Sequence, residues 1–221
     1  GLNHTIWDPQ INAFNNTIIA YDILGHGQTE LKKDNISFDD FGDQLFNLLD
    51  ELNVEKIHLV GFSIGSLIAR NFAVRFSNRL ESLTLLCSVY KRNKKQQNIV
   101  KDRYELVKKS RKLSKQALKR WFTDKYLEEN PKAYKKITEI LNQNKMENFL
   151  KVYNLFVNHE DKEQLKEINT KTLIMTGEND IGSTPEMSKN LSQVIKESKL
   201  HIVPNGKHLC SIECAYDVNT A

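Results

Sequence analysis

The sequence predicts an α/β fold with a mainly parallel sheet, helices on both faces of the sheet, and an inserted helical segment. Short apolar runs rich in β-branched residues alternate with helical patterns along most of the chain. Runs that are apolar throughout are typical of strands buried on both faces of a parallel sheet. About 80 residues between the third and fourth of these runs carry no strand pattern, which indicates the insertion.

The elements follow one another in a regular order. We expect strands at residues 17–21, 56–60, 83–87, 172–175 and 200–203. Ser37 is placed to cap a helix with apolar residues at helical spacing, and a second helix is expected from about Ile64 to Phe76. Further helical patterns lie around residues 100–107, 118–122, 131–141 and 146–157. The chain is therefore divided into a core of residues 1–88 and 169–221 and a helical lid of residues 89–168.

Composition narrows the class of protein. Charged residues make up 27% of the chain and hydrophobic residues 39%, as in soluble globular proteins, and no apolar run reaches the length of about 18 residues that spans a membrane. The net charge of the chain is +4, but residues 91–136 alone carry a net charge of +12 and the rest of the chain carries −8. Since this basic segment lacks the spaced aromatic residues of a base-stacking platform, a solvated lysine-rich surface is favoured over nucleic-acid binding.

The three cysteines do not form a recognisable framework. Cys87, Cys210 and Cys214 are too few for a set of disulfides, and no histidines follow at the spacing of a metal site. We expect buried thiols in a reducing, cytoplasmic environment and no bound metal.

The pentapeptide Gly61-Phe62-Ser63-Ile64-Gly65 carries the strongest chemical signal. It follows a predicted strand directly and opens a predicted helix, the context in which G-x-S-x-G places a serine on a tight, strained turn. A side chain at either glycine is expected to collide with the neighbouring helix or strand. Ser63 would then project from the carboxyl end of the sheet as a nucleophile, and the Ile64 N–H at the helix N-terminus would donate to an oxyanion.

A serine hydroxyl needs a base and a carboxylate that orients the base. Of six histidines, two fall inside predicted strands, one lies in a glycine turn, and two precede or interrupt helices. Only His208 follows a strand within a glycine-containing loop. Glu178 and Asp180 both follow the fourth predicted strand, so the residues alone leave the acid open between them.

The chain order of serine, acid and histidine, together with the G-x-S-x-G context, resembles the α/β-hydrolase superfamily over essentially the whole chain. Residues 21–29 are similar to the family's D-x-x-G-x-G-x-S/T turn, in which the aspartate, here Asp22, is structural. The resemblance implies that Asp180 is the acid of a Ser63–Asp180–His208 triad. It also implies a small-molecule ester or lactone substrate and no cofactor.

Several further segments are similar to 3-oxoadipate enol-lactonases. They are Trp7-Asp8-Pro9-Gln10, Arg120-Trp121-Phe122-Thr123, His208-Leu209, Ile212-Glu213 and Asn219. This resemblance implies that Arg120 and Trp121 contact the substrate, with Arg120 holding a carboxylate and Trp121 covering the ring. The alternative is that Trp121 and Phe122 only pack the lid onto the core while Arg120 points to solvent.

The chain departs from the family pattern at its ends. Gly1 corresponds to the last glycine of a segment similar to H-G-x-G, so the residue giving the second oxyanion N–H and the family's first three strands are expected to lie outside the given sequence. Most of the final helix is expected to lie beyond Ala221. Because one of those strands lies inside the family's sheet, we expect the given chain to fold poorly alone.

The predicted activity is hydrolysis of a carboxylic ester or lactone through an acyl-enzyme. A general carboxylesterase, a perhydrolase or a C–C bond hydrolase would use the same triad. A haloalkane dehalogenase is disfavoured because it needs an aspartate where Ser63 stands. A catalytically silent ligand-binding protein on this scaffold is a further alternative, which an intact triad disfavours. We expect neither a membrane nor a nucleic acid as partner.

Overall fold

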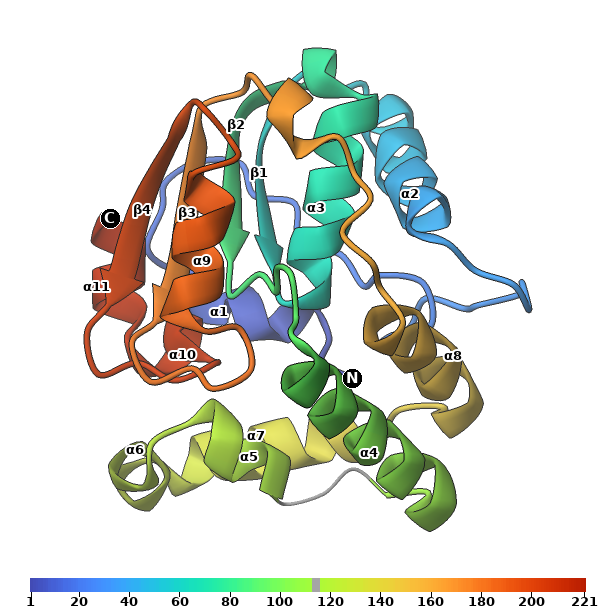
Figure 1. Cartoon of the computed structure of the whole chain (residues 1–221), viewed down its shortest axis with the longest axis vertical. Helices are drawn as coiled ribbons and strands as arrows, with labels where there is room; N and C mark the ends of the chain where they lie inside the picture. Colours follow the sequence, from blue (N-terminus) through green and yellow to red (C-terminus); the bar gives the residue numbers. More distant parts are fainter. Residues whose placement is uncertain (113–115) are drawn as a thin grey trace.

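A parallel four-stranded sheet forms the centre of the protein (Figure 1). The structure is a computed structural model that describes residues 1–112 and 116–221. The strands pair in the order β1-β2-β3-β4, and every pair is parallel; they are β1 (Ile57–Phe62), β2 (Leu80–Leu86), β3 (Thr172–Gly177) and β4 (Ser198–Val203). The mainly parallel sheet predicted from the sequence is therefore confirmed.

The strand predicted at residues 17–21 is wrong. Residues 17–23 have no regular secondary structure, and the side chains of Ile18 and Ile19 are 40% and 38% exposed. β-branched residues favour an extended backbone, but a strand also needs a ladder partner. In the described sheet β1 is an edge strand, on which Val60 is 48% exposed, and residues 17–21 do not pair with it.

Alternate residues of β1, β2 and β3 face two separate apolar layers. Leu85 and Ile174 point into a core with helices α2 (Phe38–Glu51), α3 (Ile64–Arg75) and α9 (Pro185–Ser192). Leu86 and Met175 point into a second core, which includes residues of η1 (His4–Trp7), α10 (Cys210–Glu213) and α11 (Ala215–Thr220), and α1 (Asp8–Ile11) packs beside α10 and α11. Both faces of the sheet are thus covered, as predicted from its apolar strands.

Local sequence explains where α2 begins. Asp40 accepts hydrogen bonds from the Ser37 backbone N–H (2.7 Å) and from the Ser37 hydroxyl (2.9 Å), which satisfies a donor at the helix start. Phe41, Leu45 and Leu49 recur at helical spacing and are all buried. The predicted helix is therefore held both by its cap and by its buried face.

The chain between β2 and β3 is helical in its described part. It contains α4 (Lys94–Ser110), α5 (Gln116–Trp121), α6 (Asp124–Glu129), α7 (Pro131–Asn142), α8 (Met146–Val157) and the short 3-10 helix η3 (Leu165–Glu167). Another short 3-10 helix, η2 (Ser77–Arg79), directly precedes β2. Helices α4 to α8 lie at the carboxyl ends of the strands, whereas η3 lies at their opposite ends (Figure 1), so the helical insertion between the third and fourth core strands predicted from the sequence is confirmed. Among the described helices, none is both long and apolar enough to cross a membrane.

Arg70 joins both ends of the lid to the core. Its side chain, on α3, is fully buried and donates to Asp161 (2.7 Å), Glu163 (2.9 Å) and the Val89 carbonyl (2.9 Å). Asp161 also accepts the Lys91 backbone N–H at 2.7 Å. One guanidinium therefore binds the segment that enters the lid and the segment that leaves it.

Replacing Arg70 should destabilise the fold, because Asp161 and Glu163 would lose their shared cation. We expect Arg70→Ala to lower the free energy of unfolding by about 3 kcal/mol, near the lower end for buried pairs since both carboxylates stay 14% exposed. Urea denaturation measures this. The control is Arg75→Ala on the same helix, whose pairs with Asp39 and Asp43 lie at the surface and should contribute less than about 1 kcal/mol. Equal losses in the two variants would contradict the role of Arg70.

Candidate active site

Ser63 lies on the sharp turn between β1 and α3. Its backbone is in the left-handed half of conformational space, with φ 53° and ψ −116°, a strained conformation for a residue with a side chain. The Ser63 N–H donates to the Leu86 carbonyl at 2.9 Å, which anchors the turn to β2. Strain of this kind persists where the surrounding structure fixes it, and it occurs often at functional sites.

Only one of the two glycines in the pentapeptide is required by close packing. A Cβ at Gly61 would lie 2.3 Å from the Gly65 carbonyl oxygen and 2.8 Å from the Ala69 Cβ, so no side chain fits there. The collision expected at Gly65 is wrong, because a Cβ at that position would meet no atom within 4 Å. The helix can approach the strand closely because Gly61 has no side chain.

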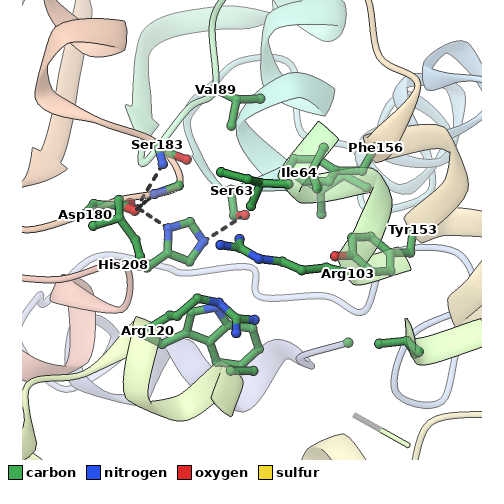
Figure 2. Close-up of a pocket in the computed structure, with 18 of the residues that line it drawn as sticks. Ser63, Ile64, Val89, Arg103, Arg120, Tyr153, Phe156, Asp180, Ser183 and His208 are labelled. Carbon is green, nitrogen blue, oxygen red and sulfur yellow. Dashed lines mark hydrogen bonds and ion pairs between the residues drawn. The ribbon is translucent and has the colours of Figure 1, made fainter. Parts of the chain in front are cut away.

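Three side chains from three strand ends form a continuous chain of hydrogen bonds (Figure 2). The Ser63 hydroxyl lies 3.1 Å from His208 Nε2, and His208 Nδ1 lies 2.6 Å from Asp180 Oδ2. Because Asp180 accepts the proton on Nδ1, the neutral imidazole presents Nε2 as an acceptor to Ser63. The three residues that the sequence pointed to are thus brought together in space.

Asp180 is held as an anion under His208. Its Oδ1 accepts the backbone N–H groups of Gly182 (2.8 Å) and Ser183 (3.0 Å). Burial on its own would raise the pKa of Asp180, but the charge and hydrogen bond of His208 and these two N–H groups hold its pKa below the usual value. In the same way burial would lower the pKa of His208, but the charge and hydrogen bond of the Asp180 carboxylate outweigh this and raise the pKa of His208 above its ordinary value.

Glu178, the other candidate acid, serves the loop instead of the imidazole. Its carboxylate accepts the Asn205 backbone N–H at 2.9 Å, at a residue with φ 59°. The neighbouring Gly177 must lack a side chain, because a Cβ there would lie 2.3 Å from the Lys207 carbonyl oxygen. Glu178 and Gly177 together shape the loop that carries His208.

A pocket of about 370 Å³ opens above Ser63 and His208 between the core and the lid. Ile64 lines it and is the first residue of α3, so its N–H has no partner within the helix. Trp121 lies beside His208, with ring centroids 6.4 Å apart, and Arg120 lines the same pocket. Phe122, in contrast, is fully buried and stacks on Tyr126, so it packs the lid.

Two pocket residues were missed from the sequence. Arg103 on α4 and Tyr153 on α8 both line the pocket, and Figure 2 shows the Arg103 guanidinium pointing toward Ser63 and His208. Arg103 stands one helical turn from Val100 and from Val107, which form the buried face of α4. That spacing could have placed Arg103 on the inner side of the helix.

The lid is bound directly to the segment around His208. The Leu209 N–H donates to the Trp121 carbonyl at 2.9 Å, and Lys207 Nζ donates to the Lys119 carbonyl at 2.9 Å. Glu213 accepts the Thr123 backbone N–H at 3.1 Å. Trp121 and Arg120 are therefore fixed relative to His208 by bonds on both sides.

The cysteines lie below this site. Cys87 and Cys210 are buried and free, as predicted, but Cys214 is partly exposed, so the expectation of burial is wrong for that residue. The Cys87 thiol donates to the His208 carbonyl at 3.2 Å. Burial is the main reason that the pKa of Cys87 lies well above its ordinary value. The thiol therefore stays protonated and supports the His208 backbone through this hydrogen bond.

Two groups of side chains have metal-binding spacing among the described residues. In Cys87, Asp180 and His208, the aspartate and histidine bind each other, and the thiol is protonated. In His159, Asp161 and Glu163, the two carboxylates already bind Arg70. Neither group offers a free set of ligands for an ion.

Comparison with known proteins places the chain in a family. The family described as "alpha/beta hydrolase fold" matches residues 1–214. Two curated proteins of Acinetobacter baylyi are similar: (E)-2-((N-methylformamido)methylene)succinate hydrolase, 26% identical over 100% of this chain and 85% of that protein, and 3-oxoadipate enol-lactonase 1, 27% identical over 96% and 80%. The malate-bound structure of a thermophilic esterase from Thermogutta terrifontis superimposes with a TM-score of 0.88 at 21% identity, covering 99% of this chain and 83% of that one.

The family match spans nearly the whole chain, and the parallel sheet, the helical insertion and the serine turn after β1 are those expected from the resemblance stated above. The chain belongs to the α/β-hydrolase family.

Proposed function

We propose that this protein hydrolyses a carboxylic ester or lactone through an acyl-enzyme on Ser63. The observation that carries the proposal is the unbroken chain of hydrogen bonds from Ser63 Oγ through His208 to Asp180 at the base of a pocket. A nucleophile, a base and an orienting anion in this geometry are the elements of serine acyl transfer.

In the proposed mechanism each of these groups has one role. His208 Nε2 takes the Ser63 proton as Oγ attacks the carbonyl carbon, and the carbonyl π electrons move to the oxygen to form a tetrahedral oxyanion. The Ile64 N–H donates to that oxyanion. When the oxyanion collapses, His208 gives its proton to the leaving alcohol oxygen, and water repeats the sequence on the acyl-enzyme. Asp180 stabilises the imidazolium throughout.

The pocket supports a small substrate. Its volume of about 370 Å³ falls near the lower end of the roughly 300–1,000 Å³ usual for small-molecule sites. Arg120 and Trp121 are proposed as substrate contacts, since both line this pocket and are fixed beside His208. The enol-lactonase and the succinate-derivative hydrolase among the relatives act on small carboxylic compounds by their names, which favours the same class here.

Loss of the nucleophile should abolish hydrolysis and leave the fold intact. We expect Ser63→Ala to lower kcat for a small ester by about 10⁴-fold or more. The matched control is Ser82→Ala, because Ser82 also bonds a histidine (His58 Nδ1, 2.8 Å) but lies on the exposed strand surface outside the pocket. A Ser63→Ala enzyme that kept a tenth of the activity would exclude Ser63 as the nucleophile.

Substitutions of the two candidate acids, Asp180 and Glu178, should differ clearly in how much they lower kcat. Asp180→Asn removes the anion that holds the imidazole and should lower kcat by several orders of magnitude, about 10⁴-fold. Glu178→Gln keeps an acceptor for the Asn205 N–H and should lower kcat less than about tenfold. Steady-state kinetics of both variants on one ester tests this, and reversed losses would mean that Glu178 is the acid.

The pH dependence follows from the charge on His208. A protonated imidazole cannot accept the Ser63 proton, so kcat/KM falls as the pH drops through the pKa of His208. Because Asp180 raises the pKa of His208 above the ordinary 6.5, the acid limb for a neutral ester should lie above pH 6.5. In Asp180→Asn that limb should shift to lower pH. A wild-type limb below 6.5, or one unmoved by Asp180→Asn, would argue against this coupling.

A further inference from the structure

Three large apolar side chains are exposed at the mouth of the pocket. They are Ile99 and Leu106 on α4, which are 40% and 54% exposed, and Ile181 in the loop between β3 and α9, which is 63% exposed. Single exposed apolar residues are normal on a protein surface and need no explanation. Here, however, three of them come from two elements far apart in the sequence and line the same pocket as Ser63.

On α4 the two apolar residues interrupt a polar surface. Ile99 and Leu106 are seven positions apart, close to two helical turns, so they lie on one face of the helix. The other exposed side chains of α4 are all polar or charged. The outer surface of this helix is therefore apolar only where it borders the pocket.

The apolar surface continues inward from the mouth. Val100 and Val107, each the next residue along α4, also line the pocket and are buried. Val89, drawn above Ser63 in Figure 2, is a further buried residue of its wall. An apolar group bound near Ser63 would thus find apolar contacts both inside the pocket and at its mouth.

Ile181 is held at the mouth by the turn that follows Asp180. Asp180 Oδ1 accepts the backbone N–H groups of Gly182 (2.8 Å) and Ser183 (3.0 Å). The Ser183 carbonyl in turn accepts the Thr176 hydroxyl at 2.7 Å. These bonds fix the backbone around Ile181, so its exposed position belongs to the same turn that holds the Asp180 carboxylate.

We infer that the substrate carries an aliphatic chain that packs against Ile99, Leu106 and Ile181 at the pocket mouth. The occupant is a part of the substrate because the three side chains line the same pocket as Ser63. The inference rests on the proposed function and specifies its substrate: a carboxylic ester or lactone whose chain extends beyond the part that the pocket encloses. Each methylene that is fully removed from water should favour binding about fourfold.

The kinetic test varies the length of the chain. The substrates are the 4-nitrophenyl esters of acetic, butanoic, hexanoic and octanoic acid, each kept below the concentration at which it aggregates. We expect kcat/KM of the wild type to rise about two- to fourfold for each added methylene that reaches the mouth. In Ile99→Gln, Leu106→Gln and Ile181→Gln the ratio of kcat/KM for octanoate to that for acetate should fall about three- to tenfold. Alkyl acetates of the same chain lengths test the alcohol side of the ester, and a rise in either series that the variants reduce upholds the inference.

The matched control is Leu52→Gln. Leu52 directly follows α2, is 49% exposed and does not line the pocket, so the same substitution there should leave the octanoate-to-acetate ratio at the wild-type value. Equal rates along both series in the wild type, or a ratio unchanged in all three mouth variants, would overturn the inference. A ratio that fell as far in Leu52→Gln would also overturn it, since the effect would then come from the surface in general. A wild-type rate that rose only once the ester aggregates would assign the exposed residues to a lipid surface instead.

A binding experiment separates this inference from the proposed function. Ser63→Ala protein is titrated calorimetrically with methyl butanoate and methyl octanoate, so that no turnover is needed. We expect methyl octanoate to bind about tenfold more tightly or better, and Leu106→Gln in the same background to reduce that difference. Tighter binding of the longer ester without any ester hydrolysis by the wild type would uphold the chain site and refute the activity. Hydrolysis of the acetate by the wild type, with equal binding of the two methyl esters, would uphold the activity and refute the chain site.

Discussion

The candidate active site depends on the parallel direction of the strands, which brings their carboxyl ends to one edge of the sheet. Ser63 follows β1, Asp180 follows β3 and His208 follows β4, although Ser63 and Asp180 lie 117 positions apart along the chain. Cys87 follows β2, between β1 and β3, and its thiol supports the His208 backbone. A shift in the register of any strand would move one of these groups out of hydrogen-bond distance.

The lid extends this arrangement into a pocket. Arg70 binds the segment that enters the lid and the segment that leaves it to α3, the helix that begins at the residue after Ser63. Hydrogen bonds from residues 207–213 hold the stretch around Trp121 against the segment that carries His208. The same few contacts therefore hold Ser63 and His208, the proposed nucleophile and base, and the walls of the pocket in fixed positions relative to one another. Such positioning is what lets bound substrate react as if it were already at high local concentration.

Much of this could be predicted from the sequence, because it depends on local patterns. The strands β1 to β4, the capped helix α2 and the serine turn all carry short-range signals in apolar spacing and glycine placement. The failures are non-local. The run at residues 17–21 has strand propensity but no pairing partner, Gly65 has open space where a collision was expected, and the inward direction of Arg103 depends on how the lid packs. The choice of Asp180 over Glu178 needed either the family resemblance or the geometry.

Labelling of the nucleophile tests the central claim most directly. An alkyl 4-nitrophenyl phosphonate should react once per protein molecule, with Ser63 Oγ bonding to phosphorus and 4-nitrophenolate leaving, and peptide mass spectrometry should place the adduct on the segment containing Ser63. The adduct should be lost in Ser63→Ala, and it should form far more slowly in His208→Ala because the base is gone. A stoichiometric adduct on another residue, or labelling that is as fast without His208, would contradict the triad.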